Sequence, residues 1–305
     1  MIAFLRRVGF FILMNFAVMI LLGVIMSAIN IFFPWALNFA GGMGSIFLYA
    51  LVIWFGWAFI SLFLSRWMAK SSYGIQVLIP EKMHEAHPKL RLVYETVERI
   101  ALSHHIQMPE VGYYESPEPN AFATGATKNS SLVAVSTGLL NAMDDREVAG
   151  VIGHEMAHVL NGDMVTMTLL QWVLNTFVVF FAHIVARMVA SFLEKDRENA
   201  LSYFAYNALY MLFQMVFGFL ALLVMMWYSR AREYRADLGW AQFTSKANMI
   251  AGLKKLKSIT ELQKFPTMNH GNLKAFMITE PDGFLSTHPS LANRIKALEE
   301  NYQLP

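Results

Sequence analysis

The pentapeptide His154-Glu155-Met156-Ala157-His158 has the residue types and the spacing that metal-dependent hydrolysis requires. Two histidines four positions apart on a helix lie on one face, one turn above the other, so both imidazoles can reach the same ion. Glu155 follows the first histidine and can address a metal-bound water. Zinc lowers the pKa of such a water, and a carboxylate can take its proton and pass it to a leaving amine. The pattern is therefore typical of zinc-dependent peptide hydrolysis.

A third metal ligand must come from elsewhere, because catalytic zinc normally has three protein ligands and an open fourth position. The metzincin pattern, which continues with a glycine and a third histidine, is excluded because Asn161 and Met164 occupy those positions. The best candidate is Glu233, within the charged segment 229–237. Glu233 and Asp237 are four apart on a predicted helix, so one can bind metal while the other orients a ligating histidine.

Membrane segments must position both parts of this site. Four nearly uncharged stretches each approach the roughly 20 residues that cross the hydrocarbon core; they are residues 8–29, 45–64, 165–189 and 203–227. His158 lies about seven residues before the third stretch, and Glu233 lies about six after the fourth. If both helices continue into the membrane, each ligand lies on the order of 10 Å from it. We expect a zinc ion that bridges these two helices just above the bilayer.

Polar residues weaken the membrane signal of the last two stretches, namely His183, Asn175 and Asn207. A pair of buried core helices is therefore the alternative interpretation for these stretches. The orientation follows from the basic residues that flank the stretches: Arg6, Arg7, Arg66, Lys70, Arg230, Arg232 and Arg235. The positive-inside rule then predicts that both termini and the large segment 66–164 are cytoplasmic.

The composition agrees with a membrane protein. Hydrophobic residues make up 56% of the 305 residues and charged residues 15%, whereas a soluble domain carries about 25% charged residues. This balance excludes intrinsic disorder and argues against an ordinary soluble enzyme. The net charge of +2 gives no reason to expect a nucleic-acid partner, and the absence of cysteine excludes disulfides, thiol nucleophiles and cysteine-ligated metals.

The fold class that we expect is a mainly α membrane protein with four transmembrane helices and a split cytosolic α+β catalytic domain of the zincin type. Four parts follow: an N-terminal transmembrane hairpin (1–65), a cytosolic part with the zinc helix (66–164), a second transmembrane hairpin (165–227) and a cytosolic C-terminal part with the third ligand (228–305). In the cytosolic part, residue patterns predict a helix over 89–105, a strand over 111–114, a hairpin from 121–124 and 132–136, and a helix that opens at 144–147.

Several ordered motifs resemble the HtpX family of bacterial integral-membrane zinc metalloproteases, which is related to the prenyl-protein-processing membrane proteases. The resemblance covers essentially the whole chain. It includes two N-terminal spans, the segments 119–125 and 131–140, the zinc motif with its continuation to Met164, Arg232-Glu233-Tyr234-Arg235-Ala236-Asp237, and Ser286-Thr287-His288-Pro289. It implies a gluzincin-type site in a multi-pass protein of the bacterial cytoplasmic (inner) membrane, with the active site on the cytoplasmic side.

The resemblance also implies the role of each site residue. One Zn²⁺ per chain is bound by His154, His158 and Glu233, Glu155 is the general base, and Asp237 supports a ligand from behind. His288 stabilises the developing oxyanion, with Arg294 nearby, although a surface arginine is the preferred interpretation of Arg294. The strand of Asn120, Ala121, Phe122 and Ala123 holds an extended substrate by main-chain pairing.

The expected function is cleavage of misfolded membrane proteins or unfolded polypeptides on the cytosolic side, as part of stress response and protein quality control. The first alternative is processing of lipid-modified C-termini, which needs a larger chamber than four segments enclose. A second is a non-catalytic, metal-binding membrane scaffold. A third is cleavage within the bilayer, but polar residues at 144–147 and 161–163 bracket the zinc motif and argue against it.

Overall fold

The computed structural model describes residues 43–194, 203–243, 246–262 and 288–300, together with Val24, Ser27 and Ile31. The first predicted span, residues 8–29, lies outside the described residues apart from Val24 and Ser27. The chain divides into two compact units, one of residues 1–61 and 169–222, the other of residues 62–168 and 223–305. The second unit contains all the predicted site residues.

Three described helices are long and apolar enough to cross a membrane, over Ala50–Tyr73, Asp163–Leu193 and Phe204–Ala241. They belong to α3 (Met43–Tyr73), α7 (Asp163–Glu194) and α8 (Tyr203–Phe243). Each of the three predicted stretches that the structure describes is therefore helical, and each helix extends beyond the predicted bounds. The interpretation of the last two as buried core helices is wrong, because large apolar side chains on both are exposed, including Phe181, Phe192, Met211 and Met215.

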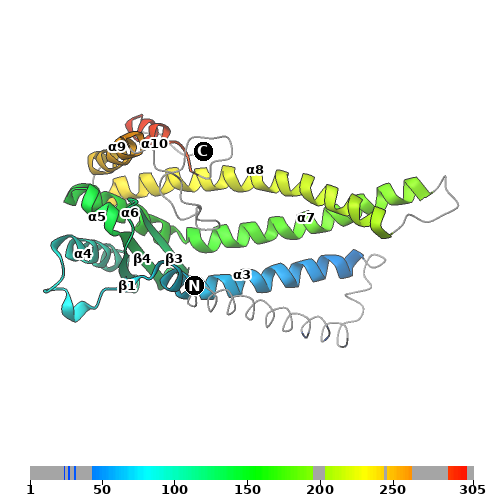
Figure 1. Ribbon diagram of the computed structural model, residues 1–305, viewed down its shortest axis with the longest axis horizontal. Coiled ribbons are helices and arrows are strands. Elements are labelled where there is room, and N and C mark those ends of the chain that lie inside the picture. The colour runs from blue at the N-terminus through cyan, green and yellow to red at the C-terminus, as the bar shows by residue number, and fades with distance from the viewer. Residues whose placement is uncertain are drawn as a thin grey trace. The chain divides into compact units, whose positions relative to one another are not determined.

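A small mixed sheet lies in the second unit (Figure 1). Its strands are β1 (Gln76–Val77), β2 (Glu110–Tyr114), β3 (Ala121–Thr127) and β4 (Ser130–Ser136), in the order β1-β2-β4-β3. Strands β2 and β4 are parallel, and the other neighbours are antiparallel. The predicted strand and hairpin are confirmed, although β3 and β4 are longer than expected. Among the described strands β3 pairs with β4 alone, so it is an edge strand.

Both faces of the sheet are covered because side chains alternate along each strand. On β4, Val133 and Val135 join the main core with Ile152 and Met156 of α6 (Asp145–Asn161). Leu132 and Ala134 point to the opposite face, where they pack near Tyr73 at the end of α3, with Tyr114 and Phe122. The zinc helix α6 therefore rests on the sheet through its apolar face.

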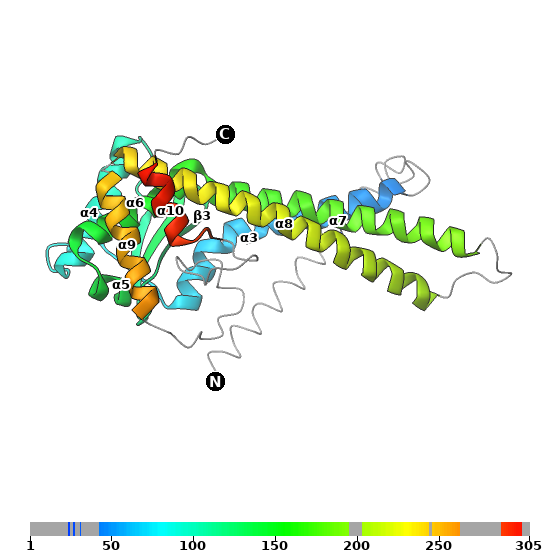
Figure 2. The same cartoon turned by 90° about the horizontal axis from the view of Figure 1, so that it is seen from above.

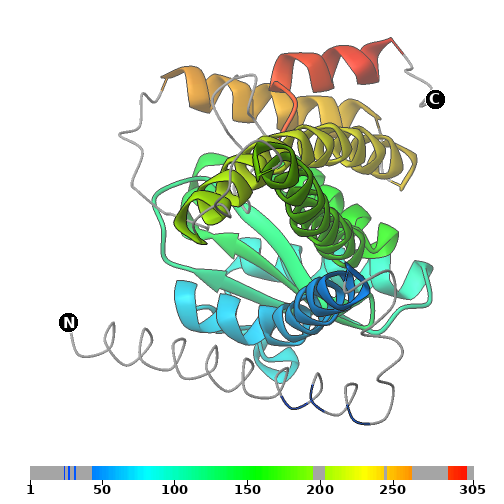
Figure 3. The same cartoon turned by 90° about the vertical axis from the view of Figure 1, so that its right-hand side faces the viewer.

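The remaining helices complete the second unit. They are α4 (Pro88–Ser103), the short α5 (Thr137–Ala142), α9 (Lys246–Leu262) and α10 (Leu291–Glu299), with a 3-10 turn at Pro80–Lys82. The predicted helix over 89–105 is thus confirmed as α4. Figure 2 shows α9 beside α10, and the pair is also seen in Figure 3. Helix α9 also packs against α6, so the zinc helix is enclosed by helices as well as by the sheet.

Helix α6 begins and ends at well-defined caps. The Asp144 carboxylate accepts from the Glu147 backbone N–H, and the Glu147 carboxylate accepts from the Asp144 backbone N–H, both at 2.8 Å. This capping box confirms the predicted helix start. At the other end, Gly162 takes a left-handed conformation with φ of 69°, which glycine adopts without steric cost. The expected continuous helix from His158 into the membrane is therefore wrong: α6 ends at Asn161 and α7 begins at Asp163.

Candidate metal centre

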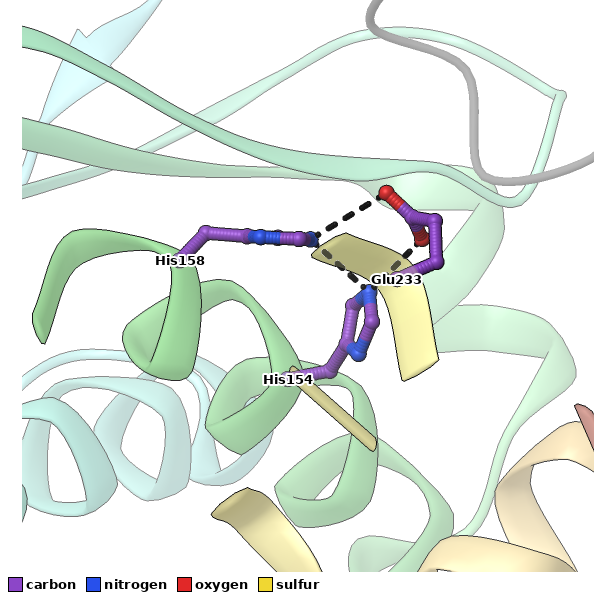
Figure 4. Close-up of side chains that lie close together, drawn as sticks. All are labelled: His154, His158 and Glu233. Atoms are coloured by element: carbon purple, nitrogen blue, oxygen red, sulfur yellow. Dashed lines mark hydrogen bonds and ion pairs between the residues drawn. The ribbon is translucent and has the colours of Figure 1, made fainter. Parts of the chain in front are cut away.

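Three of the predicted ligands converge in one buried cluster (Figure 4). The Nε2 atoms of His154 and His158 lie 3.1 Å apart. The Glu233 carboxylate faces both, with 3.3 Å from Oε2 to His154 Nε2 and 3.4 Å from Oε1 to His158 Nε2. The histidines come from α6 and the glutamate from α8, so two segments about 80 residues apart in the sequence form one donor set.

The donor set fits a zinc ion. Ligand atoms at about 2.1 Å from a tetrahedral ion lie about 3.4 Å from one another, close to the observed separations. Within the described residues, neither oxygen of the buried Glu233 carboxylate accepts a hydrogen bond of normal geometry. Such an acceptor needs a cation or donor, because burying it unsatisfied is costly. Of the two acidic residues that the sequence offered, it is Glu233 that faces both imidazoles.

Each ligating histidine is held from behind by a carboxylate. The Nδ1 atom of His154 lies 3.0 Å from Asp237 Oδ1, and that of His158 lies 2.7 Å from Asp163 Oδ2. A histidine that donates from Nδ1 leaves Nε2 free to bind metal. Asp237 was predicted to support a metal ligand from behind, and its contact with His154 is the one that this role requires. The role itself stays a prediction. Sequence reasoning missed Asp163, because residues 161–163 were considered only as polar residues that bracket the zinc motif.

The interpretation of Arg294 as a surface residue is wrong. Its side chain is 1% exposed, and it donates to both oxygens of Asp237, at 2.8 Å from Nε and 2.6 Å from Nη2. Its Nη1 lies 3.5 Å from Glu233 Oε2. Helical periodicity could have predicted this burial, because Arg294 shares a helix face with the buried Leu298, four residues later. The buried guanidinium therefore holds Asp237 by two hydrogen bonds and places a positive charge beside Glu233.

These carboxylates control the charge of the imidazoles. Burial and Arg294 lower the pKa of His154, but its contacts with the Asp237 and Glu233 carboxylates outweigh them, so the pKa is raised. Burial also lowers the pKa of His158, yet the Glu233 charge and the Asp163 hydrogen bond raise it to about 9. The negative potential that holds protons on the imidazoles also favours a cation at their Nε2 atoms.

The other predicted catalytic residues lie close to this cluster. Glu155 is buried on α6, directly after the ligand His154. His288 precedes α10 and brings its Nδ1 atom to 3.2 Å from Glu233 Oε2. Both predicted catalytic side chains are thus in the same unit as the ligands, although α6 and residue 288 are far apart in the sequence.

The predicted substrate strand forms part of the sheet edge. Ala121, Phe122 and Ala123 belong to β3, and Asn120 immediately precedes it. The Asn120 side-chain amide donates to the Tyr114 hydroxyl at 2.9 Å, so this side chain supports the sheet. The ring of Phe122 packs on Tyr114 and Tyr73. The side chains of Asn120 and Phe122 are therefore engaged in the fold, and the backbone of β3 is the part that could pair with another chain.

A close helix crossing sets the distance between α6 and α8. A Cβ atom on Gly153 would lie 1.8 Å from the ring of Trp240, so only glycine allows this approach. Trp240 is fully buried and lies on the same face of α8 as Glu233 and Asp237. Gly153 precedes the ligand His154, so the contact fixes the two helices where the ligands must meet. No pattern in the sequence pointed to Gly153 or Trp240 individually.

Comparison with known proteins agrees with this geometry. Residues 86–302 match the family model described as peptidase family M48. The chain is 42% identical to "Protease HtpX" of Tolumonas auensis over 304 residues, covering 97% of this chain and 99% of that protein. It is 44% identical to "Protease HtpX" of Glaesserella parasuis, covering 96% of this chain and 99% of that protein.

A solved structure shares the fold. The crystal structure of S. mikatae Ste24p superimposes with a TM-score of 0.62 at 19% identity, covering 97% of this chain and 66% of that chain. The interpretation as a non-catalytic metal-binding scaffold is wrong, because the family and the three-ligand cluster together identify a metalloprotease. The chain belongs to peptidase family M48 and, within it, to the HtpX membrane zinc metalloproteases.

Proposed function

We propose that this metalloprotease cleaves misfolded membrane proteins and unfolded polypeptides on the cytosolic side of the bacterial cytoplasmic membrane. The distribution of basic residues around the spans supports cytosolic termini and a cytosolic site. The cytosolic part is split in sequence, over 66–164 and 228–305, and the two transmembrane hairpins are 1–65 and 165–227. One zinc ion per chain is held by His154, His158 and Glu233.

Glu155 acts as the general base. Its position next to His154 on α6 supports this role, because the carboxylate can then take a proton from the attacking water and pass it to the leaving amine. A zinc ion held by the three ligands supplies Lewis acidity toward the scissile carbonyl and lowers the pKa of a water. Burial keeps the site at low effective dielectric, where the charge of the Glu155 carboxylate acts most strongly.

His288 donates to the oxygen of the scissile carbonyl as negative charge develops on it. The contact of His288 with Glu233 supports this, since it holds the imidazole at the edge of the ligand cluster. A single donor of this kind contributes about 3 to 4 kcal/mol to transition-state stabilisation. Arg294 acts through Asp237 and Glu233, so it is a positioning residue.

The substrate binds as an extended strand along the outer edge of β3. An edge strand carries unpaired backbone N–H and C=O groups that can pair with a peptide. Strand β3 also packs against α6, the helix that carries His154 and Glu155, which brings a paired peptide toward the ligands. Pairing through the backbone is indifferent to side chains, so it suits a protease that accepts many damaged proteins.

The observation that carries this function is the convergence of two α6 imidazoles and one α8 carboxylate beside Glu155. The test compares the wild-type chain in detergent with Glu155→Gln, using zinc content and cleavage of casein and of an unfolded membrane protein. The variant should retain zinc and lose cleavage, and retained cleavage would overturn the role of Glu155. Preferential cleavage of a prenylated peptide over the membrane protein would instead support processing of lipid-modified C-termini.

A further inference from the structure

We propose that Asp163, the first residue of α7, is a positioning residue that holds the metal ligand His158 and fixes it to the start of that helix. This inference rests on the zinc site proposed above and adds to it a residue outside both the zinc motif and the Glu233 segment. It also joins the metal centre to a helix that continues as a candidate membrane span.

The first observation is the contact itself. Asp163 Oδ2 lies 2.7 Å from His158 Nδ1, and the two side chains are 3% and 10% exposed. This length is typical of a charge-assisted hydrogen bond. Asp163 differs from Asp145, which also lies in the first turn of a helix but is exposed. Stabilisation of a helix N-terminus alone does not require burial, so the burial of Asp163 points to a specific partner.

The second observation is the chain path that makes the contact possible. In a continuous helix, residue 163 would be displaced about 140° around the axis from residue 158, and the two side chains could not meet. Gly162 interrupts the helix with φ of 69°. Its N–H bonds back to the Val159 carbonyl, and its own carbonyl accepts from Val165. One glycine therefore ends α6 and starts α7, and the break returns Asp163 to His158.

The third observation is how Asp163 differs from Asp237, which supports the other ligand. Asp237 is shared between His154 and Arg294. Within the described residues, the side chain of Asp163 is paired with His158 alone. His158 Nδ1–H donates to Asp163, so Nε2 keeps its lone pair for the metal and the ring is held in one orientation. Loss of this carboxylate should therefore weaken metal binding directly.

The test measures zinc affinity of the full chain in detergent, by competition with a chromophoric chelator. Asp163→Ala should bind zinc roughly 10- to 100-fold more weakly than wild type. Asp163→Asn keeps a hydrogen-bond acceptor without the charge, so it should lose less zinc affinity than Asp163→Ala. Asp163→Glu should recover part of the affinity. Asp145→Asn makes the same chemical change in the exposed first turn of α6 and should leave the affinity unchanged.

A second readout separates positioning from a purely structural role. The absorption spectrum of the cobalt-substituted protein reports the ligand geometry, and it should change in Asp163→Ala but not in Asp145→Asn. A loss of zinc affinity smaller than about tenfold in Asp163→Ala overturns the proposal. If that variant does not fold, Asp163→Asn carries the test, and wild-type affinity with an unchanged cobalt spectrum overturns it. A wild-type chain that binds no zinc would refute the proposed function itself.

Discussion

The two histidines of the candidate metal centre lie one helical turn apart on α6, yet they are supported by different kinds of contact. His154 depends on Asp237 of α8, which is held by Arg294 of α10, so its support spans 140 residues of sequence. His158 depends on Asp163, five residues away across a glycine break. One histidine is thus oriented by the tertiary fold and the other by the local chain path, and among the described carboxylates Glu233 is the one that contacts the Nε2 atoms of both.

Removal of Glu233 should have the largest effect, because it eliminates the ligand that both histidines share. We expect Glu233→Ala to lose zinc and to reduce casein cleavage to background, while the protein still folds. Metal analysis and the cleavage assay measure this, with the exposed Glu85→Ala as the matched control. A zinc content in Glu233→Ala equal to that of wild type would show that Glu233 is not the third ligand that the two histidines share.

Arg294→Met should disturb the contacts that support His154 and leave those of His158 intact. It leaves Asp237 buried without its cation, which typically costs about 3 to 5 kcal/mol in the free energy of unfolding. The control Arg66→Met removes a half-exposed partner of Glu110 and should cost at most about 1 kcal/mol. Denaturant unfolding of both variants measures the difference. Equal, small losses would show that the buried arginine contributes little to the site.

Removal of the metal tests whether one ion links the two histidines of α6 to Glu233 of α8. A ligand that binds only the folded state stabilises it by about 2.7 kcal/mol at a concentration 100 times its Kd. Chelation should therefore lower the thermal midpoint of the wild-type chain and leave that of Glu233→Ala unchanged. A chelator effect of the same size in both proteins would mean that the stabilising ion binds elsewhere.

Gly153→Ala should have the smallest effect of these changes, and it tests the helix spacing rather than the ligands. The added methyl group meets the Trp240 ring, and overpacking of this kind costs about 1 to 3 kcal/mol. Gly252→Ala on α9 is the matched control, because its Cβ makes only ordinary contact, 3.6 Å from the Glu147 carbonyl. Unfolding curves should separate the two variants. A Gly153→Ala protein as stable as the control would show that the crossing can relax.

Part of the site could be predicted because its signals are local. The pairing of His154 with His158 follows from helical periodicity, and the start of α6 follows from its acidic capping residues. Glu233 was the best candidate for the third ligand because it lies about as far after the fourth apolar stretch as His158 lies before the third, although Asp237 stayed open beside it. Asp163 was overlooked because residues 161–163 were considered only as polar residues that bracket the zinc motif, and Arg294 because a charged residue on a short helix is ordinarily exposed.

The amino-acid sequence was enough to identify the chemistry: a zinc motif, a distant carboxylate and long apolar helices, together with the family to which they belong. The three-dimensional contacts were needed to show which carboxylate faces the imidazoles, which carboxylates lie behind them, and that α6 ends before α7 begins. The physical reason is that periodicity reports which residues share one helix face, whereas contacts between helices depend on a close crossing such as that of Gly153 with Trp240.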